Sequence, residues 1–273
     1  MILNQCFVHR AHISKSKRSN TLIGVLLTSL AYVLLPTSLS AHEITAAVGT
    51  SLAPYIIQED NSGIEIDIVK EALALKNHTL RLRYPPLKQV PILYKKNAVD
   101  AALTVTKDFG LDACLSDVVI QYQNFAISLT KSNFTIKDLS DLANKKIVAF
   151  QNATTYLGDA YKIAVSAAQY TEIAKQTLQV NRLFLERDDI VIADKNIFLY
   201  YKSKTTHIKT DKPLTFHPIF PPSPYRVAFR DQKVCQDFNE GLKILKETGK
   251  TKEIMARYLN DTSAANRSTN KPL

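Results

Sequence analysis

The 273-residue sequence lacks the patterns that most often identify enzymes, metal proteins and nucleic-acid-binding proteins. It contains neither a G-x-S-x-G nucleophile motif nor an H-E-x-x-H pair, which removes the common signs of a serine hydrolase or a zinc peptidase. Its histidines and cysteines are scattered, so we expect neither a metal site nor a cofactor. No basic run is interleaved with aromatic residues, which argues against nucleic acid as a partner.

Long apolar runs are scarce, and the one that stands out lies near the N-terminus. A basic stretch that ends at Arg18 precedes an uncharged apolar stretch over 22–35, and small residues follow it up to Ala41. This order predicts a signal peptide over residues 1–41, cleaved after Ala41 or, as the neighbouring option, after Ser40, and a mature chain in the periplasm. The alternative is a permanent membrane anchor, although the run is shorter than the ~20 residues that span a bilayer.

The formal net charge of +10 is unevenly distributed along the chain. The expected signal peptide contains four basic residues and no acidic one, so the remainder holds 31 basic and 25 acidic side chains. The net charge of +6 that this leaves tolerates an anionic partner without requiring nucleic acid.

Cysteine is rare as well, with three residues in the chain. Cys6 lies in the expected signal peptide, which leaves Cys114 and Cys235 in the mature protein. Two thiols in an oxidising compartment often pair, so a disulfide between the middle of the chain and its C-terminal helical region is one interpretation. Two buried free thiols are the other, and both stay open at this point.

Patterns typical of strands and helices alternate along the rest of the chain. They predict strands at 44–49, 79–84 and 98–105 with helices at 63–73 and 87–96 between them, then strands at 146–150 and 190–193 with helices at 154–168, 175–185 and 195–202. This alternation indicates parallel sheets that are covered on both faces. A proline-rich crossing segment at 216–224 precedes a strand at 225–229, a mostly helical region at 234–259 and a flexible polar tail at 261–273.

Several short motifs follow one another in an order that is found in a known family. They are Ala53-Pro54-Tyr55, Gly63-Ile64-Glu65-Ile66-Asp67, Thr104-Val105-Thr106, Ile136-Lys137-Asp138-Leu139, Gln151-Asn152-Ala153-Thr154-Thr155 and Asp189-Ile190-Val191-Ile192-Ala193-Asp194. With them, the chain from Ile44 to Leu259 resembles the extracellular solute-binding proteins of family 3, the amino-acid type. The resemblance implies an α/β, two-lobed type II periplasmic binding fold, in which each lobe is a mostly parallel sheet flanked by helices. It places lobe 1 at 42–127 plus 223–260 and lobe 2 at 128–222, with the ligand at the strand ends between them.

The same resemblance implies a function without catalysis. The expected role is to capture a small polar ligand, amino-acid-like or an amine, as a monomer, and to deliver it to the membrane permease of an ABC transporter. A ligand-sensing module that acts on a sensor protein, without transport, is one alternative. A dehydratase-like enzyme on the same fold is another, because a fold alone does not determine activity.

The resemblance also implies candidate ligand-binding residues in lobe 1. Tyr55 matches a loop aromatic that stacks on the ligand, although a tyrosine that packs on its own lobe fits the sequence too. Thr104 and Thr106 match a hydroxyl-rich turn that hydrogen-bonds the ligand, while strand-end threonines chosen for β propensity are the alternative. Phe109 stands where the family's arginine binds the ligand carboxylate, which puts an ordinary α-amino acid in doubt as the ligand.

In lobe 2 the resemblance implies contacts from two further segments. Thr154 and Thr155 match a turn at a helix start, where free N–H groups suit an anion, or they act only as helix caps. Asp194 matches the acidic residue that pairs with a ligand ammonium, and a helix cap is again the alternative. An acidic residue without the arginine predicts a ligand with a cationic or hydroxyl-rich end and a less demanding anionic end.

Overall fold

The computed structural model of the chain describes residues 42–50, 52–107, 110 and 112–268, with side chains described as far as residue 260. The predicted signal peptide and Phe109 lie outside the described residues. No helix within the described ranges combines the length and the apolar character that a bilayer crossing needs.

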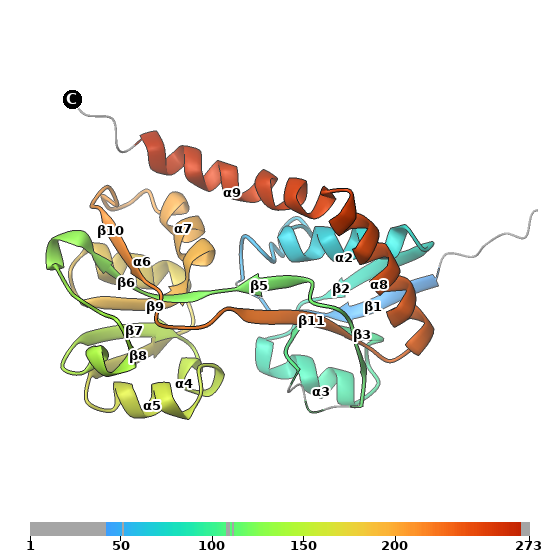
Figure 1. Ribbon diagram of the computed structural model, residues 1–273, viewed down its shortest axis with the longest axis horizontal. Helices are drawn as coiled ribbons and strands as arrows, with labels where there is room; N and C mark the ends of the chain where they lie inside the picture. The colour runs from blue at the N-terminus through green and yellow to red at the C-terminus, as the bar shows by residue number, and fades with distance from the viewer. Residues whose placement is uncertain (1–41, 51, 108–109, 111, 269–273) are drawn as a thin grey trace, which may run out of the picture. The chain divides into compact units, whose positions relative to one another are not determined.

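Two β-sheets and their flanking helices form the molecule (Figure 1). The first sheet consists of β1 (His42–Ala47), β2 (His78–Arg83), β3 (Ala101–Val105), β4 (Cys114–Leu115), β5 (Ile120–Tyr122) and β11 (Ser223–Phe229). The second consists of β6 (Asn124–Leu129), β7 (Lys146–Phe150), β8 (Gln169–Ile173), β9 (Ile190–Asp194) and β10 (Leu214–His217). The α-helices are α2 (Ile64–Ala74), α3 (Val90–Lys95), α4 (Ala153–Tyr156), α5 (Asp159–Val165), α6 (Gln176–Phe184), α7 (Lys195–Lys204), α8 (Gln232–Glu247) and α9 (Lys250–Ser268).

The first sheet has the strand order β2-β1-β3-β11-β4, with β5 paired to β11. Strands β1, β2 and β3 are parallel, whereas β11 runs antiparallel to β3, β4 and β5. The central strand β3 is almost fully buried, and β2 at the edge alternates between half-buried and exposed positions. These burial patterns follow from the sequence, since a covered central strand needs a continuous apolar run and a half-covered edge strand needs alternation.

The second sheet has the order β10-β6-β9-β7-β8. Strands β9, β7 and β8 are parallel, and β6 runs antiparallel to both β9 and β10. Every residue of β9 is buried, because helices cover both faces of the sheet at its centre. Each sheet is therefore mixed, with a parallel half and an antiparallel half, where the sequence analysis expected mostly parallel sheets. The two-lobed α/β architecture predicted from the sequence is confirmed.

The chain crosses between the sheets twice, and the two crossings lie side by side. It leaves the first sheet between β5 and β6 and returns between β10 and β11, while β5 and β11 pair with each other (Figure 1). The predicted boundary after residue 127 falls inside β6, which starts at Asn124. Hinges consist of a few loop or element-terminal residues, and both crossings contain such residues.

The expected helix at 154–168 and the expected mostly helical region at 234–259 are each interrupted by a glycine. Gly158, with φ 85°, separates α4 from α5, and Gly249, with φ 76°, separates α8 from α9. Glycine adopts this left-handed conformation without a steric penalty, so each glycine ends one helix and lets the next begin in a new direction.

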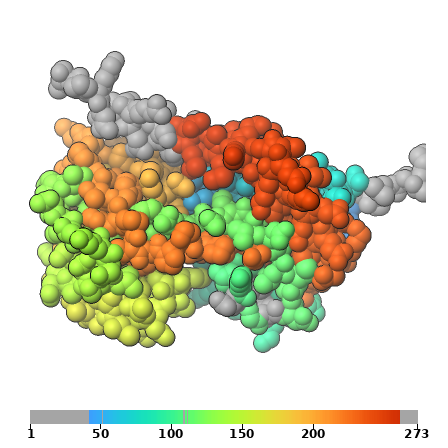
Figure 2. All heavy atoms as spheres, viewed as in Figure 1, coloured from blue at the N-terminus to red at the C-terminus, as the bar shows by residue number. Residues whose placement is uncertain are grey.

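The C-terminal segment also differs from its prediction. Helix α9 continues to Ser268, where the sequence analysis expected a flexible tail from residue 261. Residues 250–268 contain three alanines, which favour a helix, and no glycine or proline, which would oppose it. The helix packs against α2 and α8 at the first sheet and against α7 at the second. Figure 2 shows its red spheres against the cyan ones of α2.

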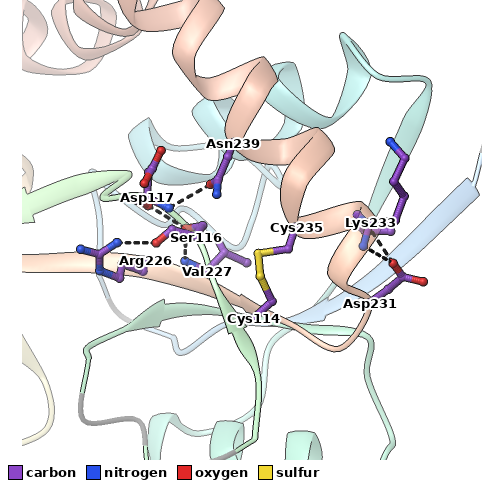
Figure 3. The surroundings of a disulfide bond; sticks show 10 residues. Cys114, Ser116, Asp117, Arg226, Val227, Asp231, Lys233, Cys235 and Asn239 are labelled. Atoms are coloured by element: carbon purple, nitrogen blue, oxygen red, sulfur yellow. Dashed lines mark hydrogen bonds between the residues drawn. A yellow bond between two sulfur atoms is a disulfide. The ribbon is translucent and has the colours of Figure 1, made fainter.

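A disulfide links two parts of the first lobe. The sulfur atoms of Cys114 in β4 and Cys235 in α8 are bonded, with their Cα atoms 6.2 Å apart (Figure 3). Next to it, the Arg226 guanidinium donates to the backbone oxygen of Ser116, and Asp231 caps α8 through the N–H groups of residues 233 and 234. The covalent link therefore ties a short edge strand to the helix that covers the sheet.

Substituting Gly241 by alanine is expected to lower the free energy of unfolding by about 1–3 kcal/mol, because of overpacking. Gly241 lies where α8 crosses α2, and a Cβ atom there would lie 2.1 Å from the backbone oxygen of Ala72. Helix propensity alone would make the same substitution stabilising, so the sign of the change reports the close approach. Urea unfolding measures it, with Lys243→Ala on the exposed face of α8 as the control, and a stabilised Gly241→Ala variant would contradict the packing.

Candidate ligand-binding cleft

A cavity of about 480 Å³ takes its wall from both sheets. Thr104 and Thr106 line it from the end of β3, and Asp194 lines it from the end of β9. Tyr122, Asn124 and Tyr225, on the crossing segments, lie on the same wall. The structure therefore brings the predicted lobe 1 turn and the predicted lobe 2 carboxylate to one cleft.

Thr104 is held in an unusual backbone conformation at this cleft. Its φ is 57°, which is rare for a β-branched residue and typical of functional sites. Two hydrogen bonds to Glu65 of α2 stabilise it: the Thr104 N–H donates to Oε1 at 2.8 Å and the hydroxyl donates to Oε2 at 2.9 Å. The Glu65 carboxylate therefore shapes the turn that the sequence analysis assigned to the ligand.

Glu65 itself is fully buried, and no basic side chain among the described residues forms an ion pair with it. Its third hydrogen bond comes from the Tyr122 hydroxyl, 3.1 Å from Oε2. Burial disfavours the charged form and raises the pKa of Glu65 to about 7, while the bonds from Thr104 and Tyr122 act in the opposite direction. Close to neutral pH, this carboxyl group is therefore partly protonated directly behind the cleft wall.

Asp194 is almost fully buried and has two structural roles. Oδ1 accepts the N–H groups of Asn196 and Ile197, which caps helix α7. Oδ2 accepts the N–H of Gln123 on the crossing segment at 2.8 Å. Burial raises the pKa of Asp194, although all these bonds oppose the rise. The helix cap that the sequence analysis named as the alternative is present, and the carboxylate still lines the cavity.

Tyr55 joins the two lobes behind the cavity. Its hydroxyl donates to Asp194 at 3.1 Å and accepts from the Asn196 side chain at 2.9 Å. Its ring stacks on Tyr122 with the centroids 3.9 Å apart, and only 1% of the residue is exposed. The ring packs on its own lobe, as the alternative interpretation had it, and it is not among the described residues that line the cavity.

The predicted lobe 2 turn is also satisfied from within the protein. Glu172 of β8 accepts the Asn152 N–H at 2.7 Å, the Thr154 N–H at 3.0 Å and the Thr154 hydroxyl at 3.0 Å. The Tyr170 hydroxyl adds a fourth bond at 2.8 Å. Partial burial opposes ionisation, but these bonds outweigh it and lower the pKa of Glu172. Thr155 lines the cavity, whereas Thr154 faces Glu172.

Sequence reasoning missed both Glu65 and Glu172 as parts of this site. A signal for Glu65 was present, since it lies three, four and seven residues before Ile68, Val69 and Ala72 on the apolar face of α2. A carboxylate on such a face needs a specific partner. Glu172 left no comparable signal, because its partners come from a distant turn.

No protein-family model matches the sequence, and the comparison with curated proteins gives no match. Among the described residues no group of histidines, cysteines and carboxylates could hold a metal ion.

Solved structures do match the fold. One is an ancestral arginine-binding protein bound to arginine, with a TM-score of 0.63 and 17% identity over 79% of this chain and 97% of that one. Another is a histidine kinase sensor domain with similarity to periplasmic binding proteins, at 0.65 and 16% over 80% and 96%. A third is the substrate-binding protein of an amino-acid ABC transporter, at 0.59 and 15% over 80% and 99%. At these identities the likeness shows the fold, which is that of the two-lobed periplasmic binding proteins.

Proposed function

We propose that this chain is a periplasmic solute-binding protein that captures a small ligand in its cleft and delivers it to an ABC-type importer. The observation that supports this most strongly is the cavity of about 480 Å³ with walls from both sheets. Ligand pockets commonly have volumes of about 300–1,000 Å³ and lie at the strand ends of α/β sheets. The same proposal includes membership in solute-binding family 3, export by a cleaved signal peptide and a monomeric state.

Binding without catalysis fits the groups around the cavity. No histidine or cysteine lines it within the part of the chain that the structure describes. The Asp194 carboxylate accepts hydrogen bonds from a helix start, a crossing strand and a tyrosine. A general base needs access to the substrate proton that it abstracts, and a carboxylate that already accepts these hydrogen bonds serves better to position a ligand.

Ligand sensing is the second candidate, and the likeness to a histidine kinase sensor domain favours it. Transport and sensing both rely on closure of the lobes around the ligand. Co-purification separates them: a permease complex retained on the ligand-bound protein supports transport, whereas a signalling partner supports sensing.

A thermal-shift screen of residues 42–273 tests the binding function that both candidates share. A ligand that binds only the folded state stabilises it by about 2.7 kcal/mol at a concentration of 100 Kd, so we expect the melting temperature to rise with at least one small ligand. Small-angle scattering of the same sample is expected to show a smaller radius of gyration. The twenty amino acids, simple amines and small organic acids form the panel, and no shift with any of them would contradict the proposal.

A further inference from the structure

The cleft has little capacity left to hold a ligand carboxylate in lobe 2. The Asn152 and Thr154 N–H groups and the Thr154 hydroxyl all donate to Glu172, at 2.7–3.0 Å. The chain therefore already supplies the carboxylate that occupies these donors. A ligand carboxylate would have to displace Glu172 or lie beside it, and two like charges at such a distance destabilise one another.

The corresponding donors in lobe 1 are occupied in the same way. The Thr104 N–H and hydroxyl both donate to the fully buried Glu65. A ligand anion at this turn would compete with Glu65 for the same two hydrogens. Two acidic side chains, one in each lobe, thus hold the turns that face the cavity.

Acidic groups also dominate the charge around the cavity. Asp194 lies on its wall with 5% of the residue exposed, and Glu65 lies directly behind Thr104. Among the described residues, neither carboxylate forms an ion pair with a lysine, arginine or histidine. The single basic residue among those that line the described wall is Lys88, which is exposed. Buried carboxylates without a basic partner favour a cation beside them.

The remainder of the wall is mainly apolar and aromatic. Leucines and valines from lobe 1 face Phe150, Tyr156 and Ile197 from lobe 2. The rings of Phe150 and Tyr156 lie 6.3 Å apart, and 49% of Tyr156 is exposed. Such a wall buries an apolar body, and aromatic faces also attract cations.

We infer that the cleft takes an organic cation with an apolar body and no carboxylate. This inference rests on the proposed binding function and narrows it to one class of ligand. The ammonium group is positioned near Asp194, where its charge compensates the carboxylate, and the apolar body fills the space between Leu103 and Tyr156. The ligand enters without an anionic group because both turns are already occupied by Glu65 and Glu172.

Isothermal titration calorimetry with three compounds that share a phenyl ring and differ in charge tests the inference. We expect 2-phenylethylamine to bind about tenfold or more tightly than L-phenylalanine or 3-phenylpropionate. Asp194 attracts its ammonium group, whereas Glu65 and Glu172 at the two turns oppose the carboxylate that each of the other two compounds carries. Tighter binding of phenylalanine, of phenylpropionate or of any other amino acid would overturn the inference and leave the binding function intact. If no compound of any charge class binds, the binding function fails as well.

A charge reversal at Lys88 provides an independent readout. Lys88→Glu is expected to increase the affinity for 2-phenylethylamine about two- to fivefold at low salt, because it removes a cation and adds an anion at the cavity wall. Lys95→Glu is the matched control, since Lys95 is exposed on the neighbouring helix α3 and does not line the cavity. Equal affinities for the two variants, or a loss of affinity in Lys88→Glu, would count against a cationic ligand.

Discussion

The free energy of unfolding of the unmodified protein is expected to fall by about 3 kcal/mol between pH 4.5 and 7, and replacing Glu65 by glutamine is expected to abolish this fall. Burial raises the pKa of Glu65 from 4.5 to about 7, so the folded state keeps a proton that the unfolded chain has already released. The stabilisation is therefore complete below pH 4.5 and is lost as the pH rises through 7. Urea unfolding at a series of pH values measures it as the difference between the two proteins.

Glutamine is a close match for the glutamic acid in this environment. Its oxygen can accept the Thr104 N–H, and its amide can donate to the hydroxyls of Thr104 and Tyr122, which also act as acceptors. Glu65→Ala is the contrasting variant, because it leaves the Thr104 N–H without an acceptor and costs about 1–3 kcal/mol for that group alone. Parallel pH profiles for the unmodified protein and Glu65→Gln would contradict the buried, partly protonated carboxyl group.

Removing the disulfide is expected to lower the free energy of unfolding by about 4 kcal/mol, because the bond closes a long loop. Cys114 and Cys235 are 121 residues apart in sequence, and an open loop of that length gives the unfolded chain many more conformations. The double variant Cys114→Ala/Cys235→Ala, exported to the periplasm and unfolded in urea, measures the effect. Alanine suits the site because Cys235 is fully buried and alanine has no polar side-chain group that would need a partner.

Reduction of the unmodified protein is the control for the double variant. Both treatments remove the same link, so their unfolding midpoints are expected to agree. For a protein that comprises residues 42–273, alkylation without a reductant is expected to leave the mass unchanged, since the two cysteines in that range, Cys114 and Cys235, are bonded to each other. Modification of both cysteines under these conditions would show that they are not bonded in the protein as it exists.

The local pattern of the chain predicted most of its strands and helices. The continuous apolar run of β9 and the alternation in β2 both specify burial on the faces where it is found. Gly158 and Gly249 were also visible in the sequence, but whether a glycine ends a helix depends on its φ value, and φ is decided by what the next helix packs against. The expected helix 154–168 and the expected mostly helical region 234–259 therefore each become two helices.

The candidate site was predicted in part. Thr104, Thr106, Thr155 and Asp194 line one cavity, as expected from the ends of strands and helix starts in an α/β fold. The pairing of Thr104 with Glu65 joins residues 39 positions apart, and that of Tyr55 with Asp194 joins residues 139 apart. No local pattern contains such pairs, because each depends on the docking of whole elements.

By itself, the sequence determined that this chain forms two α/β units whose strand ends carry hydroxyl and carboxylate groups. Hydrophobic periodicity and composition are properties of residues that are neighbours in the sequence. The tertiary structure decided which of those groups remain for a ligand. Tyr55 became a bridge between the lobes, Asp194 a helix cap, and Thr154 a partner of Glu172. Hydrogen-bond donors and acceptors are used by whatever folding brings within about 3 Å of them, and that distance is set by packing across the whole molecule.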